Sequence, residues 1–249
     1  MSASLPTGLI TALQSARNVA VLTGAGVSAE SGIPTFRDAQ SGLWAKYSPE
    51  ELASPAAFRR NPRLVWEWYA MRRAAVLAAQ PNPGHVALAQ LEQLVPHFTL
   101  ITQNVDGLHA RAGSRALIEL HGNITKVRCS VEGTFCSTWA EGEELPPPCP
   151  TCGAPLRPHV VWFGEQLPLD ALQQAWIAAE ECEVFLSIGT SGLVEPAASL
   201  PRVAYSHGAT VAVLNLDVNT RSEARLFYLH GRSGEVLPQL VERLMEEQQ

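Results

Sequence analysis

The sequence predicts an α/β protein with a doubly wound parallel sheet and a second, smaller lobe. Four short apolar runs, each typical of a buried strand, alternate with stretches of helical patterning. The runs are Val19–Leu22, Phe98–Thr102, Glu183–Ile188 and Thr210–Leu214. Two segments, 36–80 and 122–159, interrupt the alternation, and we expect them to form the second lobe. The predicted sheet domain therefore comprises 1–35, 81–121 and 160–249.

The composition is typical of a globular protein and excludes several functional classes. Of the 249 residues, 46% are hydrophobic and 17% are charged, and the longest apolar runs are too short to cross a bilayer. The net charge of −6, without a cluster of Lys and Arg, argues against nucleic acid as the main partner. The first residues show neither an export nor a transit signal, so we expect a cytoplasmic protein without a membrane partner.

A glycine-rich turn, Gly24-Ala25-Gly26-Val27-Ser28, directly follows the first predicted strand. Backbone N–H groups in such a turn can bind a pyrophosphate, although an ordinary strand-to-helix turn would look the same. A dehydrogenase would also place an acidic residue at the end of a second strand about 20 residues on. That window holds Ser48-Pro49-Glu50-Glu51, which reads as the start of a helix. Any dinucleotide bound here is therefore not held as in the dehydrogenases.

Polar residues follow two further predicted strands. Gln103, Asn104 and Asp106 come just after the strand that ends at Thr102, where open α/β sheets bind ligands. The same residue types also form ordinary turns. The segment 116–120 reads as a short strand that leads to His121, whose imidazole is suited to general-base catalysis. Because the chain has seven histidines, a surface or core role for His121 is the alternative.

Four of the five cysteines lie within 24 residues, which favours a metal site over disulfides. Cys149 and Cys152 form a C-x-x-C pair, and Cys129 and Cys136 are the natural second pair of a tetrahedral zinc site. Such a site would be structural, because four thiolates leave no open position for water or substrate. The alternative is a metal-free lobe with free thiols.

Several longer motifs occur in order: 24–28, Ser31-Gly32-Ile33-Pro34-Thr35-Phe36-Arg37-Asp38, Gln103-Asn104-Val105-Asp106-Gly107-Leu108-His109, Leu120-His121-Gly122, Gly189-Thr190-Ser191 and Asn215-Leu216-Asp217. Together they resemble the sirtuins, over nearly the whole chain from Asn18 to Leu244. The resemblance implies a Rossmann-type lobe, a smaller zinc-binding and helical lobe, and NAD meeting acyl-lysine between them. In the sirtuins the first cysteine pair is usually two residues apart, whereas six residues separate Cys129 from Cys136, so Cys136 is the least secure ligand.

The resemblance also implies roles for individual residues. Ala25, with Gly24, Gly26 and Ser28, would hold the phosphates, and Phe36 and Arg37 would lie on a loop over the nicotinamide ribose. Gln103 would bind ribose hydroxyls, Asn104 and Asp106 would position nicotinamide, and His121 would be the base. The remaining cofactor-binding residues would be Gly189, Thr190, Ser191, Asn215, Leu216, Asp217 and Ser233.

The resemblance extends to the substrate. Tyr69 and Arg72 are three apart on a predicted helix and match the sirtuins that remove succinyl and malonyl groups, as does the small Ala45. The alternative is a solvated arginine beside a packing tyrosine. Val161, Phe163 and Gly164, with Gly192, would pair with the substrate backbone as an added strand. A buried strand of the protein itself is equally compatible with residues 160 and 161.

No HExxH metal motif or GxSxG nucleophile motif is present that would support hydrolysis by other routes. The resemblance implies instead that the acyl oxygen displaces nicotinamide from NAD and that His121 then activates a ribose hydroxyl. The products would be lysine, nicotinamide and O-acyl-ADP-ribose. Two alternatives remain, an NAD-dependent protein ADP-ribosyltransferase and a catalytically silent NAD-binding regulator. The last predicted element is a helix over Gly234–Met245.

Overall fold

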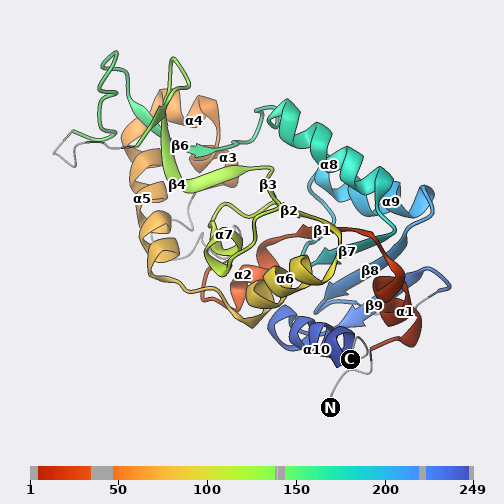
Figure 1. Cartoon of the computed structure of the whole chain (residues 1–249). Coiled ribbons are helices and arrows are strands. Elements are labelled where there is room, and N and C mark those ends of the chain that lie inside the picture. The colour runs from red at the N-terminus through yellow and green to blue at the C-terminus, as the bar shows by residue number, and fades with distance from the viewer. Residues whose placement is uncertain (1–4, 35–46, 138, 140–143, 219–222, 247–249) are drawn as a thin grey trace.

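The computed structural model describes residues 5–34, 47–137, 139, 144–218 and 223–246. Within these ranges the chain forms a large lobe around a six-stranded sheet and a small lobe around a three-stranded sheet (Figure 1). Among the helices of these ranges, none combines the length and apolar character that crossing a membrane requires.

The large sheet is parallel throughout, with the strand order β3-β2-β1-β7-β8-β9. Its strands are β1 (Asn18–Thr23), β2 (His97–Thr102), β3 (Leu117–Glu119), β7 (Val184–Ile188), β8 (Thr210–Asn215) and β9 (Leu226–His230). The direction of winding reverses between β1 and β7, which is where doubly wound sheets bind ligands. The predicted doubly wound parallel sheet is thereby confirmed. The edge strand β9 was not among the strands predicted from the sequence.

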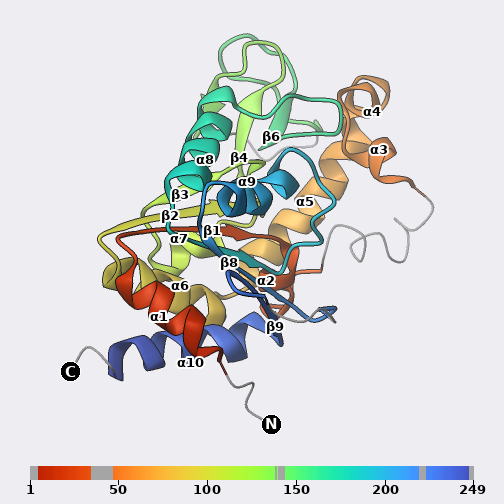
Figure 2. The same ribbon diagram turned by 90° about the vertical axis from the view of Figure 1, so that its right-hand side faces the viewer.

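Helices cover both faces of this sheet (Figure 2). One face carries α1 (Thr7–Ser15), α6 (Pro83–Leu94) and α10 (Ser233–Glu246), and the other carries α8 (Leu169–Glu181), the 3₁₀ turn η2 (Ala197–Ser199) and α9 (Leu200–Ser206). Successive residues of β1 point to opposite faces: Val19 and Val21 pack in the first core, Ala20 and Leu22 in the second. Because both faces are buried, the strands read as continuous apolar runs.

The small lobe combines two segments that are distant in sequence. Its antiparallel sheet has the order β5-β4-β6, with β4 (Gly122–Cys129), β5 (Phe135–Cys136) and β6 (Leu156–Val160). Its helices are α3 (Pro49–Leu52), α4 (Pro55–Arg60) and α5 (Pro62–Ala78). A shared core contains Trp68 from α5, Ile124 from β4 and Trp162 just beyond β6. The exact domain boundaries remain predictions.

Two short helices follow strands at the centre of the large sheet. Helix α2 (Ala25–Ala29) begins immediately after β1, and α7 (Leu108–Ala112) follows β2. Gly107, before α7, has a φ of 70°, a left-handed conformation that favours glycine. This turn redirects the chain so that the polar residues after β2 stay at the carboxyl edge.

Candidate functional site

The candidate residues of the large lobe lie beyond the carboxyl ends of its six strands. Gly24 follows β1, Gln103 follows β2, and His121 lies two residues beyond β3. Gly189, Leu216 and Ser233 lie beyond β7, β8 and β9 in the same way. Because parallel strands end at one edge, residues that are far apart in sequence are brought to the same side of the molecule.

The turns after β1 and β7 pack directly against each other at the winding reversal. Gly24 N–H donates to the Ile188 carbonyl at 3.0 Å, and Gly26 N–H donates to the Gly189 carbonyl at 2.8 Å. A Cβ atom at Gly26 would lie 2.8 Å from Gly189 Cα, closer than real contacts allow. The glycines are therefore required for this close approach.

Behind this turn, Ser28, Asn104 and Asp106 form a buried hydrogen-bond network. Ser28 Oγ donates to Asp106 Oδ2 at 2.7 Å, and Asn104 Nδ2 donates to the Gly24 carbonyl at 2.9 Å and to Ser28 Oγ at 3.1 Å. Leu108 N–H donates to Asp106 Oδ1 at 2.8 Å. Burial raises the pKa of Asp106, and the hydrogen bonds from Leu108 and Ser28 oppose that rise. The network fixes all three side chains beside the glycine turn.

A second set of contacts links the strand ends across the reversal. Gln103 Nε2 donates to Thr190 Oγ1 at 3.0 Å, and Asn215 Nδ2 donates to the Thr190 carbonyl at 2.9 Å. Ser191, Leu216 and Asp217 are exposed at this edge. The hydroxyl and carboxamide groups here are of the kinds that bind ribose, and the backbone of the glycine turn is of the kind that binds pyrophosphate. The residues present therefore fit a dinucleotide such as NAD.

His121 is oriented by a backbone carbonyl. Its Nδ1 lies 2.9 Å from the Gln103 carbonyl oxygen. Because a carbonyl can only accept, Nδ1 carries the proton of the neutral ring, and Nε2 is left as an acceptor. Burial lowers the pKa of His121, and the hydrogen bond to Gln103 partly opposes that effect. The ring is therefore neutral at pH 7 and able to take a proton.

Ser233, a predicted cofactor ligand, has a different partner. Its hydroxyl is buried and donates to Glu30 Oε1 at 2.6 Å, and Gly234 N–H donates to the same oxygen at 3.0 Å. Glu30, at the end of α2, therefore caps the start of α10. This contact makes Ser233 a link between the two helices.

Tyr69 and Arg72 lie side by side on α5, as their spacing predicted. Tyr69 is buried, and its hydroxyl accepts a hydrogen bond from Trp162 Nε1 at 3.1 Å. Burial raises the pKa of Tyr69 to about 12, so the hydroxyl keeps its proton. The Arg72 guanidinium lies 5.7 Å from the centre of the Tyr69 ring and 4.7 Å from that of Trp68. Burial lowers the pKa of Arg72, whereas electrostatic interactions with Tyr69 and Asp106 raise it.

The predicted substrate strand begins where β6 ends. Val160 belongs to β6 and pairs with Gly122, so for this residue the alternative of a strand of the protein itself is correct. Val161 N–H donates to the His121 carbonyl at 2.9 Å, while Phe163 N–H donates to the Ala53 carbonyl at 2.9 Å. Phe163, Gly164 and Gly192 are exposed. Both glycines have positive φ angles, 85° and 66°.

Three cysteines of the small lobe meet at one point. The sulfur atoms of Cys129, Cys149 and Cys152 all lie within 4.8 Å of one another, a spacing that suits a single metal ion. Cys136 stands outside this trio, but its thiol contacts Cys149. Burial raises the pKa of Cys136, and the neighbouring thiols raise it further. Three thiolates and a nearby fourth form a donor set that fits zinc. Cys182 is buried in the large lobe, away from the cluster.

Some predicted residues lie outside the described part of the chain, and some residues that shape the site were not predicted from the sequence. Phe36, Arg37 and Ala45 fall in the first group. The missed residues include Glu30 and Trp162, and also Asn82, whose Nδ2 donates to the Val27 carbonyl at 2.7 Å and so holds the end of α2. A signal existed only for Asn82, because Asn82-Pro83 reads as a helix start.

The chain matches the family model described as "Sir2 family" over residues 24–196. It is 50% identical over 242 residues to an NAD-dependent protein deacylase of Pseudomonas aeruginosa, covering 93% of this chain and 96% of that protein. It is 57% identical over 199 residues to an NAD-dependent protein deacylase of Aquifex aeolicus, covering 80% and 83% of the two chains.

Solved structures agree with these relatives. The chain superposes with a TM-score of 0.90 on a Sir2 homologue in complex with NAD, at 44% identity, covering 100% of this chain and 97% of the other. It superposes with a TM-score of 0.75 on Sir2Af2 bound to a myristoylated histone peptide, at 35% identity and 96% coverage of both chains. The chain therefore belongs to the Sir2 family, the sirtuins that its motifs resemble.

Proposed function

We propose that this protein is an NAD-dependent protein lysine deacylase in which His121 is the general base. The observation that carries the proposal is the orientation of His121, whose Nδ1 is bound to the Gln103 carbonyl and which lies at the same carboxyl edge of the sheet as the glycine turn after β1. The relatives named as NAD-dependent protein deacylases and the Sir2 homologue bound to NAD support it.

Each group of residues has a definite task in this proposal. Gly24, Ala25, Gly26 and Ser28 would bind the pyrophosphate, and Gln103, Thr190 and Asn215 would bind ribose hydroxyls. Asn104 and Asp106, held in place by Ser28, would position the nicotinamide group. The other cofactor ligands would be Phe36, Arg37, Gly189, Ser191, Leu216 and Asp217, with Ser233 acting through Glu30. Bound NAD would supply the ribose carbon that the acyl oxygen attacks, with nicotinamide as the leaving group.

His121 would accept the proton of a ribose hydroxyl at Nε2. The Gln103 carbonyl keeps the proton of the neutral ring on Nδ1, so Nε2 needs no rearrangement before the transfer. Partial burial keeps the ring neutral at the start of the reaction. The same carbonyl then stabilises the charged ring through its hydrogen bond with Nδ1.

We further propose that the acyl pocket accepts acidic acyl groups such as succinyl as well as acetyl. Arg72 would pair with the distal carboxylate, and Tyr69, protonated and fixed by Trp162, would donate to it. The charge of Arg72 acts on Asp106, which supports a location beside the nicotinamide site. Ala45 would leave room for the longer chain. Val161, Phe163, Gly164 and Gly192 would hold the backbone of the substrate protein.

Zinc would be held by Cys129, Cys149 and Cys152, with Cys136 as the fourth ligand, and would stabilise the small lobe. The substrate would be acylated lysine in proteins, and the net charge of −6 favours protein over nucleic acid. We place the reaction in the cytoplasm, where four clustered thiols stay reduced.

The proposal can be tested by mass spectrometry of acetyl-lysine and succinyl-lysine peptides incubated with the purified protein, with and without NAD. Deacylation predicts free lysine and O-acyl-ADP-ribose, both only in the presence of NAD. A peptide that gains ADP-ribose would identify a transferase instead. Unchanged peptides and intact NAD would identify a silent regulator.

A further inference from the structure

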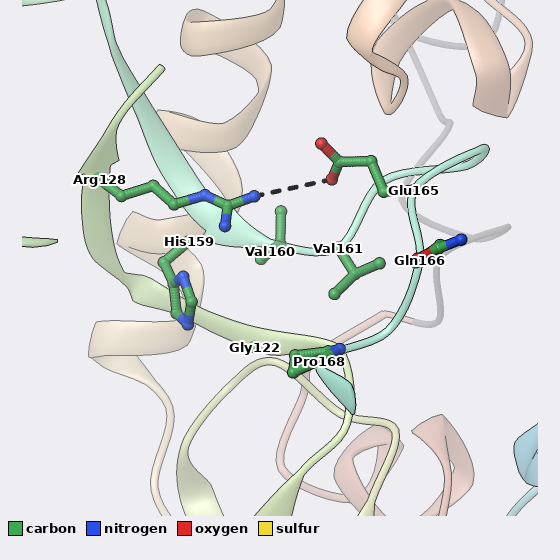
Figure 3. A pocket seen from close by; sticks show the side chains of 8 residues that line it. All are labelled: Gly122, Arg128, His159, Val160, Val161, Glu165, Gln166 and Pro168. Atoms are coloured by element: carbon green, nitrogen blue, oxygen red, sulfur yellow. Dashed lines mark ion pairs between the residues drawn. The ribbon is translucent and has the colours of Figure 1, made fainter. Parts of the chain in front are cut away.

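A pocket of about 360 Å³ opens between the sheet of the small lobe and the loop 161–168, which leads to α8 (Figure 3). Arg128 from β4 and Glu165 from the loop reach across it toward each other, and His159 from β6 lines it below Arg128. None of these three side chains has a part in the proposed reaction.

The pocket adjoins the proposed catalytic site. Gly122, which lines it, is the residue after His121, and Val161, which also lines it, donates its N–H to the His121 carbonyl at 2.9 Å. A protein held along Val161 and Gly164 would therefore pass the mouth of the pocket. A side chain near the acylated lysine could reach inside.

The charges around the pocket are unevenly paired. Arg157 donates to both oxygens of Glu165, at 2.6 and 2.9 Å, and Trp162 N–H donates to the same carboxylate at 2.8 Å. Arg128, in contrast, approaches Glu165 only to 3.8 Å, and its side chain is 27% exposed. Arg157 thus neutralises Glu165, and Arg128 retains donors for another anion.

Neighbouring groups add to the positive potential. Lys126 lies on the same strand as Arg128 and forms an exposed pair with Glu119 at 3.4 Å. Burial lowers the pKa of His159 to about 4, and Arg128, Lys126 and Arg157 contribute further to the lowering. Three cations therefore act on His159, while the described carboxylates near them are Glu165 and Glu119.

We propose that this pocket binds an acidic side chain, Asp or Glu, that lies close in sequence to the acylated lysine of the substrate protein. Arg128 would pair with the incoming carboxylate, and the rigid Arg157–Glu165 pair would form the wall behind it. This inference rests on the proposed deacylase function and adds a preference among substrates to it.

The test is a set of acetyl-lysine peptides in which Glu, Ala or Lys occupies each of the three positions on either side of the lysine. For each peptide kcat/KM is measured with the wild-type protein, Arg128→Gln, Arg128→Lys and a matched control, Arg63→Gln, which removes one exposed charge from α5. At one position we expect kcat/KM to be about 5- to 15-fold higher for the Glu peptide than for the Ala peptide. This ratio lies between the contributions of an exposed ion pair and of a buried one.

The ratio of Glu to Ala should fall to about 1 in Arg128→Gln and persist in Arg128→Lys and Arg63→Gln. Because the ratio compares two peptides on one variant, a general loss of activity or stability cancels. The proposal is overturned if no position favours Glu, or if the preference survives in Arg128→Gln. Turnover of none of the peptides by the wild-type protein would instead contradict the deacylase function itself.

Discussion

At the scale of single residues, the chemistry depends on how buried polar groups are held. The Gln103 carbonyl fixes the tautomer of His121, and the contacts of Ser28 and Leu108 fix both oxygens of Asp106. Buried polar groups are costly unless they are paired, so a polar network that is well paired stays in one arrangement. The site is therefore organised before any substrate arrives.

The pH dependence of deacylation should reflect the lowered pKa of His121. A base must be neutral, so activity falls as the pH drops through its pKa. Because burial lowers this pKa, the acidic limb of the kcat/KM profile should have its midpoint below about 6.5, the ordinary value for histidine. A midpoint above 7 would contradict the assignment.

Replacement of the same side chain gives a second test. We expect His121→Gln to lower the rate of deacylation by about 10²- to 10⁴-fold, the usual contribution of a general base. His207→Gln is the matched control, because His207 is an exposed histidine at the end of α9. Equal rates for the wild-type protein and His121→Gln would exclude His121 as the base.

The acyl pocket can be tested through the ratio of two activities. Arg72→Met should lower desuccinylation about 10- to 150-fold more than deacetylation, because only succinyl loses a charge-assisted contact. Arg63→Met, on an exposed part of the same helix, should leave the ratio unchanged. Equal losses of both activities in Arg72→Met would show that Arg72 supports the fold and not the choice of acyl group.

At the scale of elements, short helices and turns are held by side chains from distant segments. Helix α2 has only five residues and cannot be stable alone. Asn82 at the start of α6 holds the Val27 carbonyl, and Glu30 is bound to the start of α10. The orientation of the glycine turn therefore depends on two helices that lie 55 and 203 positions away from it in the sequence.

We expect Glu30→Gln to weaken this anchor. Loss of the charged cap of α10 should lower the free energy of unfolding by about 1–2 kcal/mol, as measured by urea denaturation. The KM for NAD should rise more than kcat falls, because the turn that we propose to bind the phosphates loses its support. Glu242→Gln, on the exposed face of α10, is the control. A stability loss with an unchanged KM would limit Glu30 to a structural role.

The cysteine cluster should hold one zinc ion that the small lobe needs. Cys152→Ser should lose the metal, as measured by elemental analysis. Structural zinc contributes on the order of 10 kcal/mol to the folding of small modules. The Tm of the Cys152→Ser variant should therefore fall by more than about 5 °C. Cys182→Ser should keep the metal. Full metal content in Cys136→Ser would show that the fourth ligand is not Cys136.

At the scale of the whole molecule, the sequence predicted the structural features that a local pattern of residues determines, such as the central strands. Continuous apolar runs identified the central strands because both faces of that sheet are buried. Strand β9 lies at the edge and mixes Tyr228 and His230 with apolar residues, so its pattern is weaker. Strands β4 and β6 contain Arg128 and Pro158, which hide a strand from periodicity alone.

Contacts between distant residues could not be predicted in the same way. Glu30 and Ser233 are 203 positions apart, and only the fold brings them together. The same holds for the pairing of Trp162 with Tyr69 across 93 positions. The motifs indicated the candidate residues of the site. The side chains that position them became visible only in the structure.

The most direct test of the central claim is the stoichiometry of the reaction, with nicotinamide and free lysine quantified from the same sample over time. If NAD and acyl-lysine react in the site at the carboxyl edge, one nicotinamide should appear for each lysine freed. Neither product should form when the other substrate is omitted. Lysine released without NAD, or in excess of nicotinamide, would contradict the claim.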